Sequence, residues 1–179
     1  MAPGSEFAYG DVIEVGAIQN SPGFDDKHYE ARINLSIKEV KVAPATDFDS
    51  LQDPQKFAGM IPVYVYKDLE IVSGSGAGFT DEQIVVGVDL WAAGDDQPAE
   101  TLTVFDPSGK SPLCAGNEHL ENHSGDHPNV PGKKVTNCEI FLLKEGQTVG
   151  SITYRNAAYK DELSKEDDPH KADPIVFPV

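Results

Sequence analysis

The sequence has few cysteines, little positive charge and no long apolar run. No stretch approaches the ~18 apolar residues that a bilayer-spanning helix needs, so we predict no transmembrane segment. Only 14 basic residues stand against 30 acidic ones, which gives a formal net charge of -16. Such a surface repels phosphate backbones and anionic head groups, which argues against nucleic acid as a partner. A cationic partner would be attracted to it.

The motifs of several enzyme classes are also missing. The glycine-rich stretch 74–78 lacks the Gly-Lys-Ser/Thr ending of a phosphate-binding loop. Ser73, Ser75 and Ser151 lie near glycines but outside the strand–turn–helix setting of a hydrolase nucleophile. We therefore assign no catalytic residue and no cofactor-binding residue, and we expect a protein without enzymatic activity. A hydrolase whose site is assembled from distant loops remains an alternative.

What the sequence does have is an alternation of apolar and polar residues in most of its ordered-looking stretches. It is clearest from Gln83 to Trp91, where the even-numbered positions are apolar. Period two is typical of a strand with one buried face. Segments of this kind recur between turn clusters, which predicts an all-β fold: an immunoglobulin-like antiparallel β-sandwich of seven or eight strands. A closed barrel is the alternative. The strands are expected at Tyr9–Ile18, Ala31–Val42, Ile61–Val72, Gln83–Ala93, Glu100–Phe105, Asn137–Leu143, Thr148–Arg155 and Pro174–Val179.

Four local features refine this prediction. The apolar parity of the second strand switches near Lys38, which indicates a β-bulge or a crossing between sheets. Lys67 interrupts an apolar face, which places it near an edge or a bulge. The strands around Lys144–Gln147 are expected to form a hairpin. The prolines at 174 and 178 limit the last segment to a sheet edge.

The domain organisation is simple. Gly4-Ser5-Glu6-Phe7 is what two adjacent common cloning sites encode, so residues 1–7 are interpreted as a cloning scar. Residues 8–179 then form a single domain with a long polar excursion at about 106–134. On this interpretation a signal peptide or lipid-bearing N-terminus has been removed.

The two cysteines have different settings. Cys114 lies in the polar excursion, and Cys138 lies in a predicted strand. A disulfide between them would tie the excursion to the sheet and stabilise the fold by roughly 3 kcal/mol. It would also indicate an oxidising, extracytoplasmic compartment. The alternative is a pair of buried, reduced thiols.

Three histidines concentrate in the same excursion: His119, His123 and His127. If Asn117 begins a short helix, the first two lie one turn apart, which is a spacing that suits two imidazoles on one zinc or copper ion. His127 follows Gly125 and would have to fold back to join them. The alternative is an ordinary solvated loop without a cofactor.

The order of the elements resembles a group of bacterial lipoprotein domains of unknown function with an immunoglobulin-like fold. A small immunogenic antigen secreted by mycobacteria is related to this group. The resemblance lies in Tyr64–Val72, in Cys138–Gly146 and in the closing Pro174–Phe177. It implies a sandwich outside a Gram-positive, actinobacterial cell and no known catalytic residues.

Together these features predict a secreted or surface-anchored binding or envelope protein. Its partner would be a protein or another envelope component, and its oligomeric state is left open. A metal-binding protein using the histidine segment is the alternative. Four aromatic residues are candidates for a contact patch: Tyr9, Tyr64, Tyr66 and Trp91. The alternative is that they pack against side chains of neighbouring strands.

Overall fold

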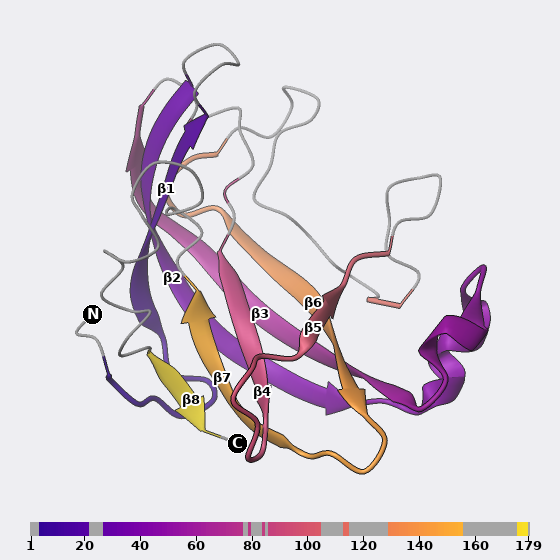
Figure 1. The fold of residues 1–179 in the computed structure, drawn as a ribbon. Helices are drawn as coiled ribbons and strands as arrows, with labels where there is room; N and C mark the ends of the chain where they lie inside the picture. Colours follow the sequence, from indigo (N-terminus) through magenta and orange to yellow (C-terminus); the bar gives the residue numbers. More distant parts are fainter. Residues whose placement is uncertain are drawn as a thin grey trace.

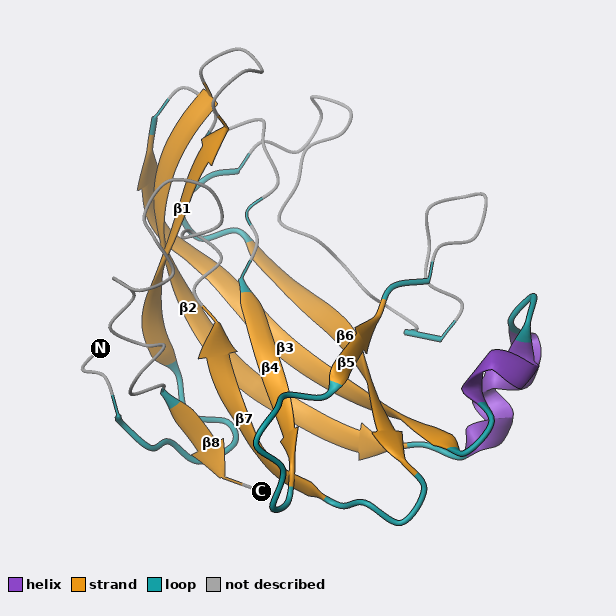
Figure 2. Ribbon diagram, in the orientation of Figure 1, coloured by secondary structure: helices purple, strands orange, loops and turns teal. Residues whose placement is uncertain are grey.

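The structure is a computed structural model that describes residues 4–21, 27–76, 79, 84, 86–104, 113–114, 129–155 and 175–178. Within these ranges it is an antiparallel β-sandwich (Figures 1 and 2). The elements are β1 (Ile13–Ser21), β2 (Lys27–Val42), η1 (Ala45–Ser50), η2 (Pro54–Phe57), β3 (Met60–Ser75), β4 (Gly87–Ala92), β5 (Glu100–Leu102), β6 (Lys134–Lys144), β7 (Val149–Arg155) and β8 (Val176–Pro178).

The strands form two sheets, with the order β1-β2-β3-β6-β5 in the larger and β4-β7-β8 in the smaller. Apolar side chains from both sheets meet in one core between the layers. The predicted all-β sandwich is therefore confirmed. In Figure 2 the 3-10 helices η1 and η2 extend beyond the end of the sandwich, after β2. In the described part of the chain no helix has both the length and the apolarity to cross a membrane.

Main-chain contacts from neighbouring segments flank both edges of the smaller sheet. On one side the chain passes from β4 to β5, where Trp91 bridges Pro98 and the Ala99 amide donates to the Leu90 carbonyl at 2.7 Å. On the other side Glu6 bridges Val176 in β8. The segment interpreted as a cloning scar thus pairs with the last strand in this structure.

The long strands β2 and β3 show how an irregularity keeps one face apolar. Their register shifts between Ile37 and Glu39, so Lys38 is an extra residue in β2. The bulge reverses the parity and returns Val40 to the core-facing side, where it packs against the core. The predicted bulge near Lys38 is confirmed. Lys67 lies opposite Ile37 at this bulge, so the prediction of a bulge near Lys67 is confirmed. The alternative prediction, that Lys67 lies at a sheet edge, is wrong because β3 is the central strand of its sheet.

The smaller sheet confirms one predicted face and corrects one connection. In the fourth predicted strand Asp89 lies outside the core. The predicted apolar face of this strand lies in the core: Ile84, Val86, Val88 and Leu90. The predicted hairpin of β6 and β7 is wrong, because β6 pairs with β3 and β5 while β7 pairs with β4 and β8. The turn after Lys144 therefore crosses between the layers. The last strand, β8, is an edge strand, as its prolines predict.

Candidate functional site

The outer face of the larger sheet, which points away from the sandwich core, carries a second apolar cluster. We call it the disulfide face. Its buried members come from β3, β6 and two flanking segments: Ala43, Tyr64, Cys114, Cys138 and Ile140. Three partly buried side chains pack against them: Tyr66, Leu102 and Leu113. A sheet that also buries apolar side chains on its outer face needs a cover there. The segment that carries Leu113 and Cys114 supplies part of it.

The two cysteines are joined in this cluster. Cys114 and Cys138 form a disulfide with their Cα atoms 5.9 Å apart, and both side chains are buried. The described residues contain no free cysteine. The bond links two positions 24 residues apart in the sequence, and it holds Cys114 against β6.

Tyr64 connects the disulfide face to the helix η1. Its hydroxyl donates a hydrogen bond to Oδ2 of Asp47 at 2.7 Å, and the Lys41 ammonium lies 5.9 Å from the centre of its ring. Burial raises the pKa of Tyr64, and the hydrogen bond to Asp47 and its negative charge raise it further. Both effects favour the neutral phenol. The contact thereby fixes the position of η1 on the sheet.

Tyr66 is the tyrosine of this face that a partner can reach. It lies opposite Glu39 in the register of β2 and β3, and it is only partly buried. Burial raises its pKa, and the charge of Glu39 adds to the shift. Tyrosine combines an apolar ring with a polar hydroxyl, and it is enriched at binding surfaces.

The remaining outer face of the larger sheet is polar and internally paired. Glu14 pairs with Arg32 across β1 and β2, and Lys134 pairs with Glu70 at 3.3 Å across β6 and β3. Asp68 accepts a hydrogen bond from Thr136 at 2.6 Å. Exposed pairs of this kind contribute little stability, and they leave few charges free to bind a ligand. The disulfide face is therefore the better candidate for binding.

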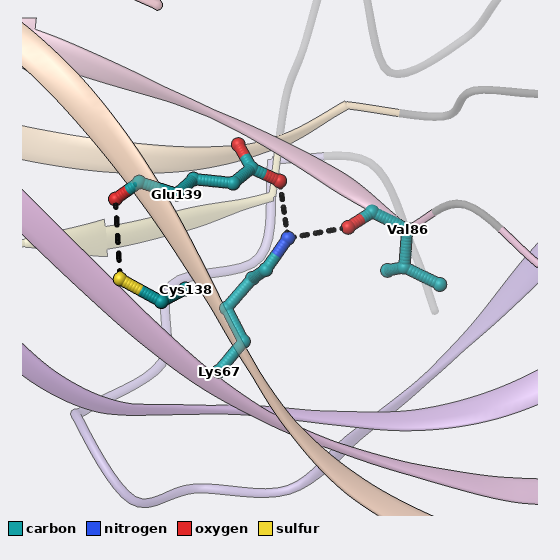
Figure 3. A network of polar contacts seen from close by, with 4 residues as sticks. All are labelled: Lys67, Val86, Cys138 and Glu139. Atoms are coloured by element: carbon teal, nitrogen blue, oxygen red, sulfur yellow. Dashed lines mark hydrogen bonds and ion pairs between the residues drawn. The ribbon is translucent and has the colours of Figure 1, made fainter. Parts of the chain in front are cut away.

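A second polar group lies on the inner face, between the two sheets (Figure 3). Lys67 is completely buried, its ammonium pairs with Oε1 of Glu139, and it donates to the carbonyl oxygen of Val86 at 2.6 Å. The other oxygen of Glu139, Oε2, is buried and has no hydrogen-bond partner among the described residues. The local sequence pattern marks Lys67 as irregular but does not reveal its partner, because 72 residues separate Lys67 from Glu139.

The other predicted site residues are not brought together in the described structure. Tyr64 and Tyr66 lie on the disulfide face, whereas Trp91 is in the smaller sheet and donates its indole hydrogen to Thr153 at 2.9 Å. Tyr9 lies in the N-terminal segment. Trp91 is therefore in a different sheet from Tyr64 and Tyr66, and its side chain makes a cross-strand hydrogen bond to β7.

The predicted metal ligands His119, His123 and His127 lie outside the described residues. Among the residues that the structure does describe, no group of three or more potential ligands surrounds a metal position. The zinc or copper site stays a prediction. Comparison with protein-family models, curated proteins and solved structures gives no match to this chain.

Proposed function

We propose that this chain is a non-catalytic binding or envelope protein that acts outside the cell or at the cell surface. The observation that carries the proposal is the disulfide face, where a disulfide joins Cys114 to Cys138 of β6 on the outer side of the larger sheet. Stable disulfides are typical of oxidising compartments. Attachment to the cell surface would agree with the resemblance to actinobacterial lipoprotein domains.

The binding surface would be centred on Tyr66, next to Glu39 and the apolar side chains of Leu102 and Leu113. This arrangement combines an accessible aromatic ring with a polar rim, which is how binding energy concentrates in protein interfaces. The net charge of -16 favours a partner with a basic surface. We expect the partner to be a protein or another envelope component, and not a nucleic acid.

A sedimentation assay tests the binding. The purified protein is mixed with isolated envelopes of the cells that encode it, and the bound fraction is measured against protein concentration. Tyr66→Ala should weaken binding about fivefold or more, because it removes a central aromatic contact. Tyr9→Ala is the matched control, since Tyr9 is exposed and lies away from the disulfide face.

The outcomes separate the proposal from its alternatives. Binding that falls when salt is raised would support an electrostatic contribution. Loss of binding after protease treatment of the envelopes would identify a protein partner. If the wild-type protein stays in the supernatant, or if the two variants bind alike, the proposed surface is wrong. A membrane-impermeant label that fails to modify the protein on intact cells would contradict the localisation.

A further inference from the structure

The inner polar group contains an unusual combination of side chains at the centre of the larger sheet. Lys67 has 0% exposed area and lies directly opposite Asn137, which has 9%, in the register of β3 and β6. Glu139 follows Asn137 by two residues, so both point to the same face of β6. A buried amine, a carboxamide and a carboxylate thus share one position between the sheets.

The surroundings of this group are apolar. On the same face of β3 and β6, Val65 and Leu69 flank Lys67, and Val135 and Phe141 flank the other two side chains. Burying an ammonium and a carboxylate in such a place is costly unless their hydrogen bonds are complete. They are not complete among the described residues, because Oε2 of Glu139 has no partner there. An ion pair placed for stability alone is a poor explanation of this arrangement.

We propose that Lys67 and Asn137 form an intramolecular isopeptide bond, with Glu139 moving the protons. Cross-strand neighbours have Cβ atoms about 4.5–5.5 Å apart, and the lysine side chain is long enough to bring its amine to the neighbouring carboxamide. Glu139 already holds the ammonium through Oε1. This inference is independent of the proposed binding function.

The chemistry balances without an oxidant or a co-reactant. Glu139 accepts a proton from the Lys67 ammonium, and the neutral amine attacks the carboxamide carbon of Asn137. The proton returns from Glu139 to the leaving nitrogen, which is the second role of a general acid–base group. The bond between that carbon and the side-chain nitrogen of Asn137 breaks. The attacking nitrogen, which is positively charged after the attack, gives its extra proton to the departing ammonia, so the leaving group departs as ammonium and the new amide keeps one N–H. Glu139 ends as it began, as a carboxylate.

The product would suit the site better than the reactants. The amide is neutral, so the buried cation disappears, and its N–H is a donor for the carboxylate of Glu139. The bond would also link β3 to β6 covalently at the centre of the larger sheet. It would therefore act with the disulfide, which ties Cys114 to the opposite face of β6.

Mass spectrometry of the full chain tests the proposal. The protein is unfolded in denaturant, its disulfide is reduced, and its intact mass is compared with that of the sequence. We expect a deficit of one ammonia molecule. Trypsin should fail to cleave after Lys67 and should release a branched peptide in which residues 57–110 are joined to residues 135–144.

Each outcome decides the question. An intact mass equal to that of the sequence overturns the proposal without any need for a variant. A deficit of ammonia without the branched peptide also overturns it, because asparagine can lose ammonia by cyclising on its own backbone. Glu139→Gln keeps the size of the side chain but removes the proton acceptor, so it should restore the full mass. If it keeps the deficit and the branched peptide, the role of Glu139 is wrong.

Discussion

The hydroxyl of Tyr154 in β7 donates a hydrogen bond to the main-chain oxygen of Gly16 in β1, at 2.6 Å. This contact connects the smaller sheet to the edge strand of the larger one. The ring of Tyr154 is buried in the core, whereas Gly16 is exposed. The hydroxyl therefore reaches from the core to an edge that water can also contact.

Removing this hydroxyl should have a small but measurable effect. Tyr154→Phe should lower the free energy of unfolding by about 1 kcal/mol, because one hydrogen bond is lost and water can replace it at the glycine. Urea unfolding measures the change. Tyr66→Phe is the control, since Tyr66 is only partly buried, and its loss should be smaller. If Tyr154→Phe is as stable as the wild type, the contact contributes nothing.

The core position of Val88 gives a sharper test of the strand register. Val88 has 0% exposed area, so Val88→Asp should cost about 3–5 kcal/mol by burying an unpaired charge. Val12 has 62% exposed area, and the same substitution there should change the stability by less than about 0.5 kcal/mol. Thermal unfolding of both variants compares them. Similar melting temperatures would show that the face of β4 is assigned incorrectly.

That face illustrates what could be predicted from the sequence. Alternation is a local property, so the apolar positions of β4 and the parity switch at Lys38 were visible in the residues themselves. The position of Asp89 outside the core could be predicted for the same reason. The last strand was placed at an edge because proline has no amide hydrogen for a neighbouring strand.

The pairing of distant segments could not be predicted in this way. The turn after Lys144 has the sequence of a hairpin, but both sides of β6 are taken by β3 and β5, so β7 joins the other sheet. Likewise, a lysine on an apolar face suggests an irregular or exposed position, because a buried charge is rare without a partner. That partner, Glu139, is supplied by register between β3 and β6, which the local pattern does not reveal.

The disulfide makes a prediction about thiols and about stability. The unfolded, unreduced protein should react with no thiol reagent, and two reactive thiols would contradict the pairing of Cys114 and Cys138. Replacing both by serine should lower the free energy of unfolding by about 3 kcal/mol in the chain-entropy model. Urea unfolding of the variant checks this value, and adding reductant to the variant should have no further effect. If reductant lowers the stability of this variant further, the effect of reductant does not come from the disulfide between Cys114 and Cys138.

The contact between Tyr64 and Asp47 predicts how stability depends on alkaline pH. Because the pKa of Tyr64 is raised in the folded protein, the folded state keeps a proton that the unfolded state loses near its usual pKa of ~10. The unfolded state then binds fewer protons, so the free energy of unfolding decreases as pH rises. The contribution of Tyr64 is therefore fully present below pH ~10 and declines above it.

Tyr64→Phe isolates this contribution. Near neutral pH the variant should be less stable than the wild type by about 1–2 kcal/mol, because the hydrogen bond to Asp47 is lost. Above pH ~10 the difference should shrink by up to ~1.4 kcal/mol per pH unit, since phenylalanine does not titrate. Urea unfolding of both proteins at several pH values gives the difference directly. Other tyrosines with raised pKa values, such as Tyr66, are present in both proteins and cancel. A difference that stays constant through the alkaline range would show that Tyr64 does not keep its proton in the folded state.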